Sequence, residues 1–133
     1  MLYPHSIRLR GPWQYAVESE NESDQRASLP DEWREVLAAA GGRKVRLRRS
    51  FNRPTRLESH ESVWLLVDAP LGLDAIALNA EALEAGSGDK LCLEFEITDK
   101  LAGQNTLEIA ISGACAGETT PWSDVRLEVR LKD

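Results

Sequence analysis

Residues 91–97 read Leu-Cys-Leu-Glu-Phe-Glu-Ile, a stretch in which every second residue is a large apolar one. Such alternation is typical of a β-strand with one face in a core and the other face in water. The same pattern recurs at residues 106–111 and 125–131, where apolar side chains again share one row of the strand. These three segments predict sheets that bury one face each.

Short strands and turn signals account for most of the remaining chain. Strands are predicted at residues 7–10, 13–17, 45–51, 55–57, 63–67, 73–78, 91–97, 106–111 and 125–131. The segment 63–67 is nearly continuous in apolar residues, which is typical of a strand buried on both faces. Many short strands between turns rich in glycine and proline favour two packed antiparallel sheets. We therefore predict an all-β, jelly-roll β-sandwich, with residues 1–133 forming a single domain.

One helix is expected within this pattern, at residues 31–40, between Pro30 and the pair Gly41 and Gly42. Its larger apolar side chains fall on one face: Trp33, Val36, Leu37 and Ala40. Residues 18–28 are polar and acidic without periodicity, and they predict an exposed loop. Residues 98–101 predict a single helical turn capped by Thr98.

The charge of the chain is acidic overall but uneven along the sequence. The 133 residues carry 16 basic and 22 acidic side chains, a net charge of −6. A chain this acidic is a poor general ligand for nucleic acid, because phosphate contacts need positive charge. Residues 43–57 nevertheless hold seven basic residues and no acidic one. Charge pairing within the fold or between protomers is expected, and Arg49, which alternates onto the apolar face of its strand, predicts a carboxylate partner.

Cysteine and histidine usage indicates no metal site, and it leaves a disulfide possible without implying one. Cys92 lies in an apolar strand and Cys115 lies elsewhere, so a buried thiol is expected and no disulfide framework is implied. Neither histidine has the spacing of a zinc site, and no cofactor or metal is predicted. The N-terminal residues lack a basic stretch followed by an apolar core, so a cytoplasmic location is expected. No apolar run approaches the roughly 18–20 residues that cross a bilayer, and no membrane partner is expected.

Six short motifs occur in order along nearly the whole chain. They are Leu9-Arg10-Gly11-Pro12-Trp13, Leu29-Pro30-x-x-Trp33, Arg48-Arg49-Ser50-Phe51-Asn52-Arg53-Pro54, Leu78-Asn79-Ala80, Phe95-Glu96-Ile97-Thr98-x-x-Leu101 and Gly103-Gln104-Asn105-Thr106-Leu107. Together they resemble the N-terminal sugar-binding domain of the β-galactosidase and β-glucuronidase family of glycoside hydrolases, here as a stand-alone domain. The resemblance implies a galactose-binding-like jelly roll and a link to carbohydrate. It also implies that Trp13 and Trp33 pack in the interior.

The departures from that family bear on function. Ala80 replaces a glycine, which predicts a reshaped turn if the position needs a positive φ. Thr120-Pro121-Trp122-Ser123-Asp124 stands where the family has Gly-Ile and an arginine before the last strand. The catalytic carboxylates of the family lie on a separate barrel, which needs roughly 200 or more residues. The resemblance therefore implies no hydrolase activity for this chain, and we predict that it is not an enzyme.

Three residues are candidates for ligand binding. Trp122 follows Pro121 in a predicted loop, and an indole in a loop is the usual stacking platform for a sugar ring. Asn79 lies at a strand end, where its alternative role is a turn asparagine that bonds its own backbone. Arg49 is the third candidate, with an inter-strand ion pair as its alternative. Trp64 lies in the most apolar strand and is expected in the core.

Two classes of function remain open from the sequence. The first is a non-catalytic carbohydrate-binding module. The alternative is a structural or protein-interaction domain that kept the fold without sugar binding, with self-association as one version, or an accessory domain of a separately encoded glycosidase. The partner is thus a glycan or a protein, because fold alone does not fix function.

Overall fold

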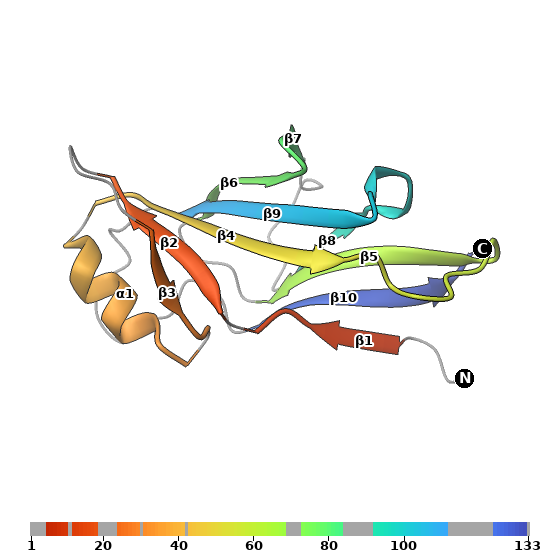
Figure 1. Ribbon diagram of the computed structural model, residues 1–133, viewed down its shortest axis with the longest axis horizontal. Helices are drawn as coiled ribbons and strands as arrows, with labels where there is room; N and C mark the ends of the chain where they lie inside the picture. Colours follow the sequence, from red (N-terminus) through yellow and green to blue (C-terminus); the bar gives the residue numbers. More distant parts are fainter. Residues whose placement is uncertain are drawn as a thin grey trace.

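The computed structural model of the chain describes residues 5–10, 12–18, 24–29, 31–41, 43–68, 73–83, 92–111 and 124–132. Its strands form two antiparallel sheets that lie as layers, with the one helix at one end beside β2 and β3 (Figure 1). The four-stranded sheet has the order β1-β10-β5-β8, and the six-stranded sheet has the order β3-β2-β4-β9-β6-β7. The predicted all-β sandwich is confirmed.

The elements have the following bounds in chain order. They are β1 (His5–Arg8), β2 (Trp13–Val17), β3 (Gln25–Ala27), α1 (Trp33–Ala40), β4 (Val45–Asn52), β5 (Glu61–Asp68), β6 (Leu73–Leu78), β7 (Glu81–Ala82), β8 (Cys92–Glu96), a 3-10 turn (Thr98–Lys100), β9 (Gln104–Ile111) and β10 (Asp124–Leu131).

The core forms between the inward rows of the two sheets. Leu65 and Leu127 from the four-stranded sheet join the same buried cluster as Leu47 and Ile109 from the six-stranded sheet. Leu47, Ile109 and Leu127 belong to rows of alternating apolar residues, and Leu65 belongs to the nearly continuous apolar segment 63–67, so these patterns placed the core correctly. Trp13 and Trp33 are 0% and 1% exposed, which confirms that both pack in the interior. The indole Nε1 of Trp13 donates to the carbonyl of Leu9 at 2.9 Å, so its one polar atom is satisfied.

The helix occupies most of the expected segment and ends where the sequence predicts. Gly41 adopts φ 56°, and its N–H donates to the carbonyl of Leu37. This left-handed residue closes the last turn, a conformation that glycine adopts without a Cβ clash. The Arg43 guanidinium donates to the carbonyl of Ala40 at 3.0 Å and satisfies one of the terminal acceptors. Trp33, Val36 and Ala40 are buried, whereas Leu37 is half-buried.

Four local features differ from the predictions. Strand β3 lies within the predicted exposed loop, and its Ala27 is buried opposite Trp13. Residues 55–57 form no strand; Arg56 has φ 61° and belongs to a turn. Strand β7 was missed, since an edge strand of two residues shows no periodicity. Thr98 does not cap its turn, because its hydroxyl accepts from the backbone N–H of Val63 at 2.9 Å instead.

The two-residue turn between β6 and β7 keeps an unusual backbone. Asn79 and Ala80 have φ 52° and 67°, and the flanking Leu78 and Glu81 pair across the hairpin. Positive φ at both central residues matches the right-handed twist of a tight hairpin. Ala80 thus adopts the positive φ that favours glycine, rather than reshaping the turn around its side chain.

We expect Ala80→Gly to raise the free energy of unfolding by about 0.5–1 kcal/mol. Relief of the left-handed strain, roughly 1–2 kcal/mol, exceeds the extra chain entropy of glycine, roughly 0.5–1 kcal/mol. Urea unfolding followed by tryptophan fluorescence measures the change. Ala82→Gly in β7 is the control, and we expect it to lower the stability. Equal losses in both variants would contradict the strained turn.

Candidate functional site

The outward face of the four-stranded sheet carries a network of ion pairs centred on Arg126. This guanidinium contacts Asp68 on the neighbouring β5, and it also lies 3.3 Å from Asp124 and 3.2 Å from Glu128. Burial opposes the charged form of Arg126, but the hydrogen bonds to Asp68 and Glu128 outweigh it and raise its pKa. The network covers the outward face of strands that are apolar on their inward face.

A second arginine extends this network toward a tryptophan. Arg130 donates to Glu94 at 2.7 Å and to Glu128 at 2.8 Å. Its guanidinium carbon lies 4.8 Å from the ring centre of Trp64, a cation–π contact. Burial opposes the charge of Arg130, yet the hydrogen bonds to the two carboxylates raise its pKa. The guanidinium is therefore held in one place against the indole.

A hollow of about 420 Å³ lies beside this stacked pair. It is lined by Ser62, Trp64, Glu96, Arg130, Leu131 and Lys132, and we call it the Trp64 hollow. The indole Nε1 donates to the hydroxyl of Ser62 at 3.2 Å, and Glu96 accepts from the hydroxyl of Thr98 at 3.2 Å. The hollow thus combines an aromatic surface with a carboxylate, a hydroxyl and two cationic side chains.

The placement of Trp64 in the core was wrong. Trp64 is half-buried, because residue 64 belongs to the outward row, where its cross-strand partners are Glu96 and Glu128. The prediction that segment 63–67 is buried on both faces holds for its neighbours, since Leu66 in the outward row is also buried. Hydropathy alone does not reveal which outward side chain stays accessible.

Cys92 is half-buried and free, at the edge of the same face. Burial raises the pKa of the Cys92 thiol to about 12, and a hydrogen bond to Asp68 acts in the same direction. The thiol therefore stays protonated near neutral pH and is a poor nucleophile. Cys115 lies outside the described residues.

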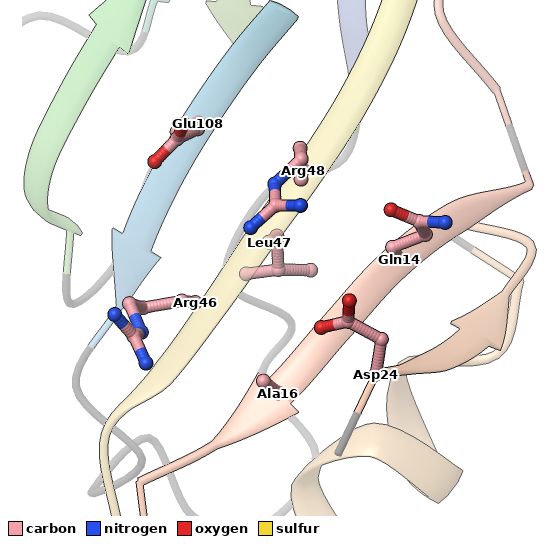
Figure 2. Close-up of a pocket in the computed structure, with 7 residues that line it drawn as sticks. All are labelled: Gln14, Ala16, Asp24, Arg46, Leu47, Arg48 and Glu108. Atoms are coloured by element: carbon pink, nitrogen blue, oxygen red, sulfur yellow. The ribbon is translucent and has the colours of Figure 1, made fainter. Parts of the chain in front are cut away.

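The outward face of the six-stranded sheet holds a smaller hollow of about 220 Å³ (Figure 2). Its lining residues are Gln14, Ala16, Asp24, Arg46, Leu47, Arg48 and Glu108. Arg46 and Arg48 come from β4, and Figure 2 shows Glu108 on the adjacent β9. These two arginines belong to the basic segment of the sequence, which the fold displays on the outward face of a central strand.

Arg49 lies in the inward row but does not meet the carboxylate that we predicted. Its Nε donates to the carbonyl of Arg10 and its Nη1 to the carbonyl of Ser50, both at 2.6 Å. In the described part of the chain no acidic side chain lies within ion-pair distance of Arg49. Burial lowers its pKa from the usual value. Backbone carbonyls take the place of a carboxylate here, and a sequence pattern does not show where such carbonyls are free.

Asn79 binds the neighbouring strand rather than its own backbone. Its Oδ1 accepts from the N–H of Thr106 at 2.9 Å, and its Nδ2 donates to Asn105 Oδ1 at 3.0 Å. Asn105 is fully buried, and its side chain also bonds both the N–H and the carbonyl of Ala102. The pair Asn79 and Asn105 thus fastens the turn after β6 to the start of β9. The motif contained Asn105, but its central position in this network was not predicted.

Two of the three predicted site residues, Arg49 and Asn79, lie on opposite sides of strand β9. Arg49 pairs with Leu107 of β9 from one side, and Leu78, which precedes Asn79, pairs with Leu107 from the other. Trp122 lies outside the described residues, two positions before the start of β10. Neither Arg49 nor Asn79 lines the Trp64 hollow, whose residues the sequence did not single out as a site.

The described residues contain no group of three or more histidine, cysteine, aspartate or glutamate side chains that could hold a metal ion. Among the same residues, the helix is too short and too polar to traverse a bilayer.

Comparison of the sequence with family models and with curated proteins finds no match. Solved structures do resemble the chain. A β-glucuronidase of Bifidobacterium dentium, complexed with coumarin-3-O-glucuronide, superposes with a TM-score of 0.72 at 18% identity, covering 100% of this chain and 32% of that one. A β-D-glucuronidase of Dictyoglomus thermophilum gives 0.72 at 16% identity, covering 97% and 28%. A β-D-mannosidase of the same organism gives 0.60 at 18% identity, covering 82% and 16%.

These similarities concern the fold. The chain spans about a third or less of each of these enzymes, and the identities are low. They confirm the fold that the motif resemblance predicted, namely that of a domain found within glycoside hydrolases of this kind.

Proposed function

We propose that this chain is a non-catalytic carbohydrate-binding module, and that the Trp64 hollow is its binding site. The observation that carries the proposal is the half-buried indole of Trp64 on a sheet face rich in charged side chains, beside Arg130 and Glu96. The fold, shared with parts of enzymes named as acting on glycosides, supports the same class of ligand. An accessible aromatic ring beside polar side chains suits a ligand with both apolar and hydroxyl surfaces.

The lining residues offer complementary partners for a sugar. The carboxylate of Glu96 accepts hydrogen bonds from ring hydroxyls, while Arg130 and Lys132 donate to hydroxyl oxygens. Hydrogen bonds to charged groups are stronger than those between neutral groups. Arg130 is already held by two carboxylates, so its side chain loses little conformational entropy when a ligand binds. A hollow of about 420 Å³ lies within the range of roughly 300–1,000 Å³ for small-molecule sites. One or two sugar rings would fill it.

Four of the acidic side chains of this face are engaged in ion pairs, which supports a binding role rather than a catalytic one. Glycoside hydrolysis needs a pair of carboxylates free to exchange a proton and to attack or to activate water. Asp68, Asp124 and Glu128 are instead engaged by Arg126, and Glu94 by Arg130. The chain also covers only 32% and 28% of the two β-glucuronidases named above.

We expect Trp64→Ala to weaken glycan binding at least tenfold and to change the melting temperature little compared with a core substitution. The indole supplies the apolar surface for the sugar ring, and loss of a central aromatic contact typically costs more than 1 kcal/mol of binding free energy. The measurement is a glycan and polysaccharide array, followed by calorimetric titration of the best ligand. Trp64→Phe keeps an aromatic ring and should retain part of the affinity.

Trp122→Ala, measured beside Trp64→Ala, decides between two locations for the site. Loss of binding in Trp64→Ala alone supports the Trp64 hollow, whereas loss in Trp122→Ala alone moves the site to the segment before β10. Trp122 remains a proposed ligand residue on the sequence argument, together with Asn79 and Arg49. Silence of the unmodified chain across the array would overturn the carbohydrate proposal and favour the protein-interaction alternative, including an accessory role for a separately encoded glycosidase.

A further inference from the structure

The basic segment of the sequence forms part of a row of polar side chains across three strands. Gln14 of β2 pairs with Arg26 of β3 on one side and with Arg48 of β4 on the other. Directly paired residues point to the same face of a sheet, and neighbouring strands lie about 4.8 Å apart. The two arginines therefore flank one glutamine with their backbones about 10 Å apart. Figure 2 shows Arg48 and Gln14 on adjacent strands of this face.

This row borders a hollow of about 340 Å³ that differs in charge from its neighbour. It is lined by Pro12, Gln14, Arg26, Arg48, Arg49 and Ser50, with no carboxylate among these lining residues. The adjacent hollow in Figure 2 shares Gln14 and Arg48 but also includes Asp24 and Glu108. Three arginines thus line one concave surface with no carboxylate in its lining, although Glu108 of β9 is the cross-strand partner of Arg48.

The three guanidiniums differ in how strongly the protein holds them. Arg49 is fixed by the carbonyls of Arg10 and Ser50, so it presents a fixed positive charge to the hollow. Arg26 and Arg48 are exposed, and neither forms an ion pair with a residue that the structure describes. Their donors are therefore available to a ligand. Like charges repel one another, and a bound anion would relieve that repulsion.

We infer that this hollow binds a tetrahedral oxyanion, a sulfate or phosphate group. Guanidinium forks match the oxygen edges of such groups, and they bind them through pairs of charge-assisted hydrogen bonds. A group with two negative charges and four oxygens uses donors from several arginines, whereas one fork already satisfies a carboxylate. The amide of Gln14 and the hydroxyl of Ser50 add neutral donors to the wall. The site lies on the opposite sheet from the Trp64 hollow and shares no lining residue with it.

The test is titration of ¹⁵N-labelled chain with sodium sulfate and with sodium phosphate, using sodium chloride at equal ionic strength as the reference. We expect saturable shifts in β2, β3 and β4 with at least one of the two anions, and at least a tenfold weaker affinity in the double variant Arg26→Gln, Arg48→Gln. Arg56→Gln removes the same charge outside the hollow and should leave the affinity unchanged. Because both substituted arginines are exposed, unchanged melting temperatures should show that the variants are folded.

A sulfated oligosaccharide and its unsulfated counterpart distinguish the source of the oxyanion. Tighter binding of the sulfated sugar than of inorganic sulfate, lost in the double variant, supports a sulfate ester on a glycan. Preference for inorganic phosphate supports a phosphate ligand of the same site. Shifts no larger than those caused by chloride, or equal shifts in the double variant, would overturn the inference. Trp64→Ala should leave anion binding intact, so the two proposals fail separately.

Discussion

Phe95→Ala should lower the free energy of unfolding by about 3–5 kcal/mol, the cost typical of removing a buried aromatic ring. Phe95 is 5% exposed in β8 and pairs with Leu65 of β5, so its ring belongs to the core between the sheets. The truncation removes apolar contacts and leaves a cavity that β8, an edge strand of the four-stranded sheet, must close. Urea unfolding followed by circular dichroism measures the loss.

Glu96→Ala is the matched control on the same strand. Its side chain is exposed on the outward face, and we expect a change within about 0.5 kcal/mol. Trp64→Ala should fall between the two, because its ring is larger but only half-buried. A loss below 1 kcal/mol for Phe95→Ala would contradict the packing of β8 against the core. A loss for Trp64→Ala as large as that for Phe95→Ala would mean that the indole is a core residue after all.

The contrast between these residues shows what the alternation of the sequence predicts well. Phe95, Leu107 and Leu127 were assigned to inward rows from a period of two, and all three are buried. The rule works because successive strand side chains point to opposite faces, so a single buried face imposes its period on the sequence. Prediction of the two-sheet architecture needed little more than that.

The same reasoning failed where burial does not follow one face. Strand β5 is apolar in both rows, and the pattern gives no reason to separate Trp64 from Leu66. The cross-strand partners do not separate them either, since Trp64 lies between Glu128 and Glu96, and Leu66 lies between Arg126 and Glu94. Short edge strands failed for a related reason, because two or three residues at β7 and β3 are too few to show a period.

The candidate sites depend on pairings between distant parts of the sequence. Ser62, Trp64 and Glu96 meet Arg130 only through the register of β5 with β8 and β10. The oxyanion hollow likewise needs the pairing of β2 with both β3 and β4. The basic segment showed a concentration of charge, and it predicted ion pairs within the fold or between protomers. For Arg49 the partners are carbonyls, and Arg48 faces outward without a described ion-pair partner.

Asn105→Ala should lower the free energy of unfolding by about 3 kcal/mol, although it removes only a small polar group. The side chain is fully buried and accepts at Oδ1 from the Ala102 N–H at 2.8 Å and from Asn79 Nδ2 at 3.0 Å. Its Nδ2 donates to the Ala102 carbonyl at 3.1 Å and to the Phe51 carbonyl at 3.4 Å. Truncation leaves these partners without Asn105, and each buried unsatisfied group costs about 1–3 kcal/mol.

The comparison with Asn79→Gly separates the buried network from the turn that it holds. Glycine keeps the positive φ of position 79, so this variant removes the bonds to Asn105 and Thr106 without new backbone strain. We expect a loss of about 1–2 kcal/mol, and a double variant that loses less than the sum, because the two side chains share a hydrogen bond. Gln104→Ala, at an exposed neighbour, should change stability by less than 0.5 kcal/mol. Strict additivity of Asn79→Gly and Asn105→Ala in urea unfolding would show that the two amides act independently, and that the turn after β6 is held to β9 by other contacts.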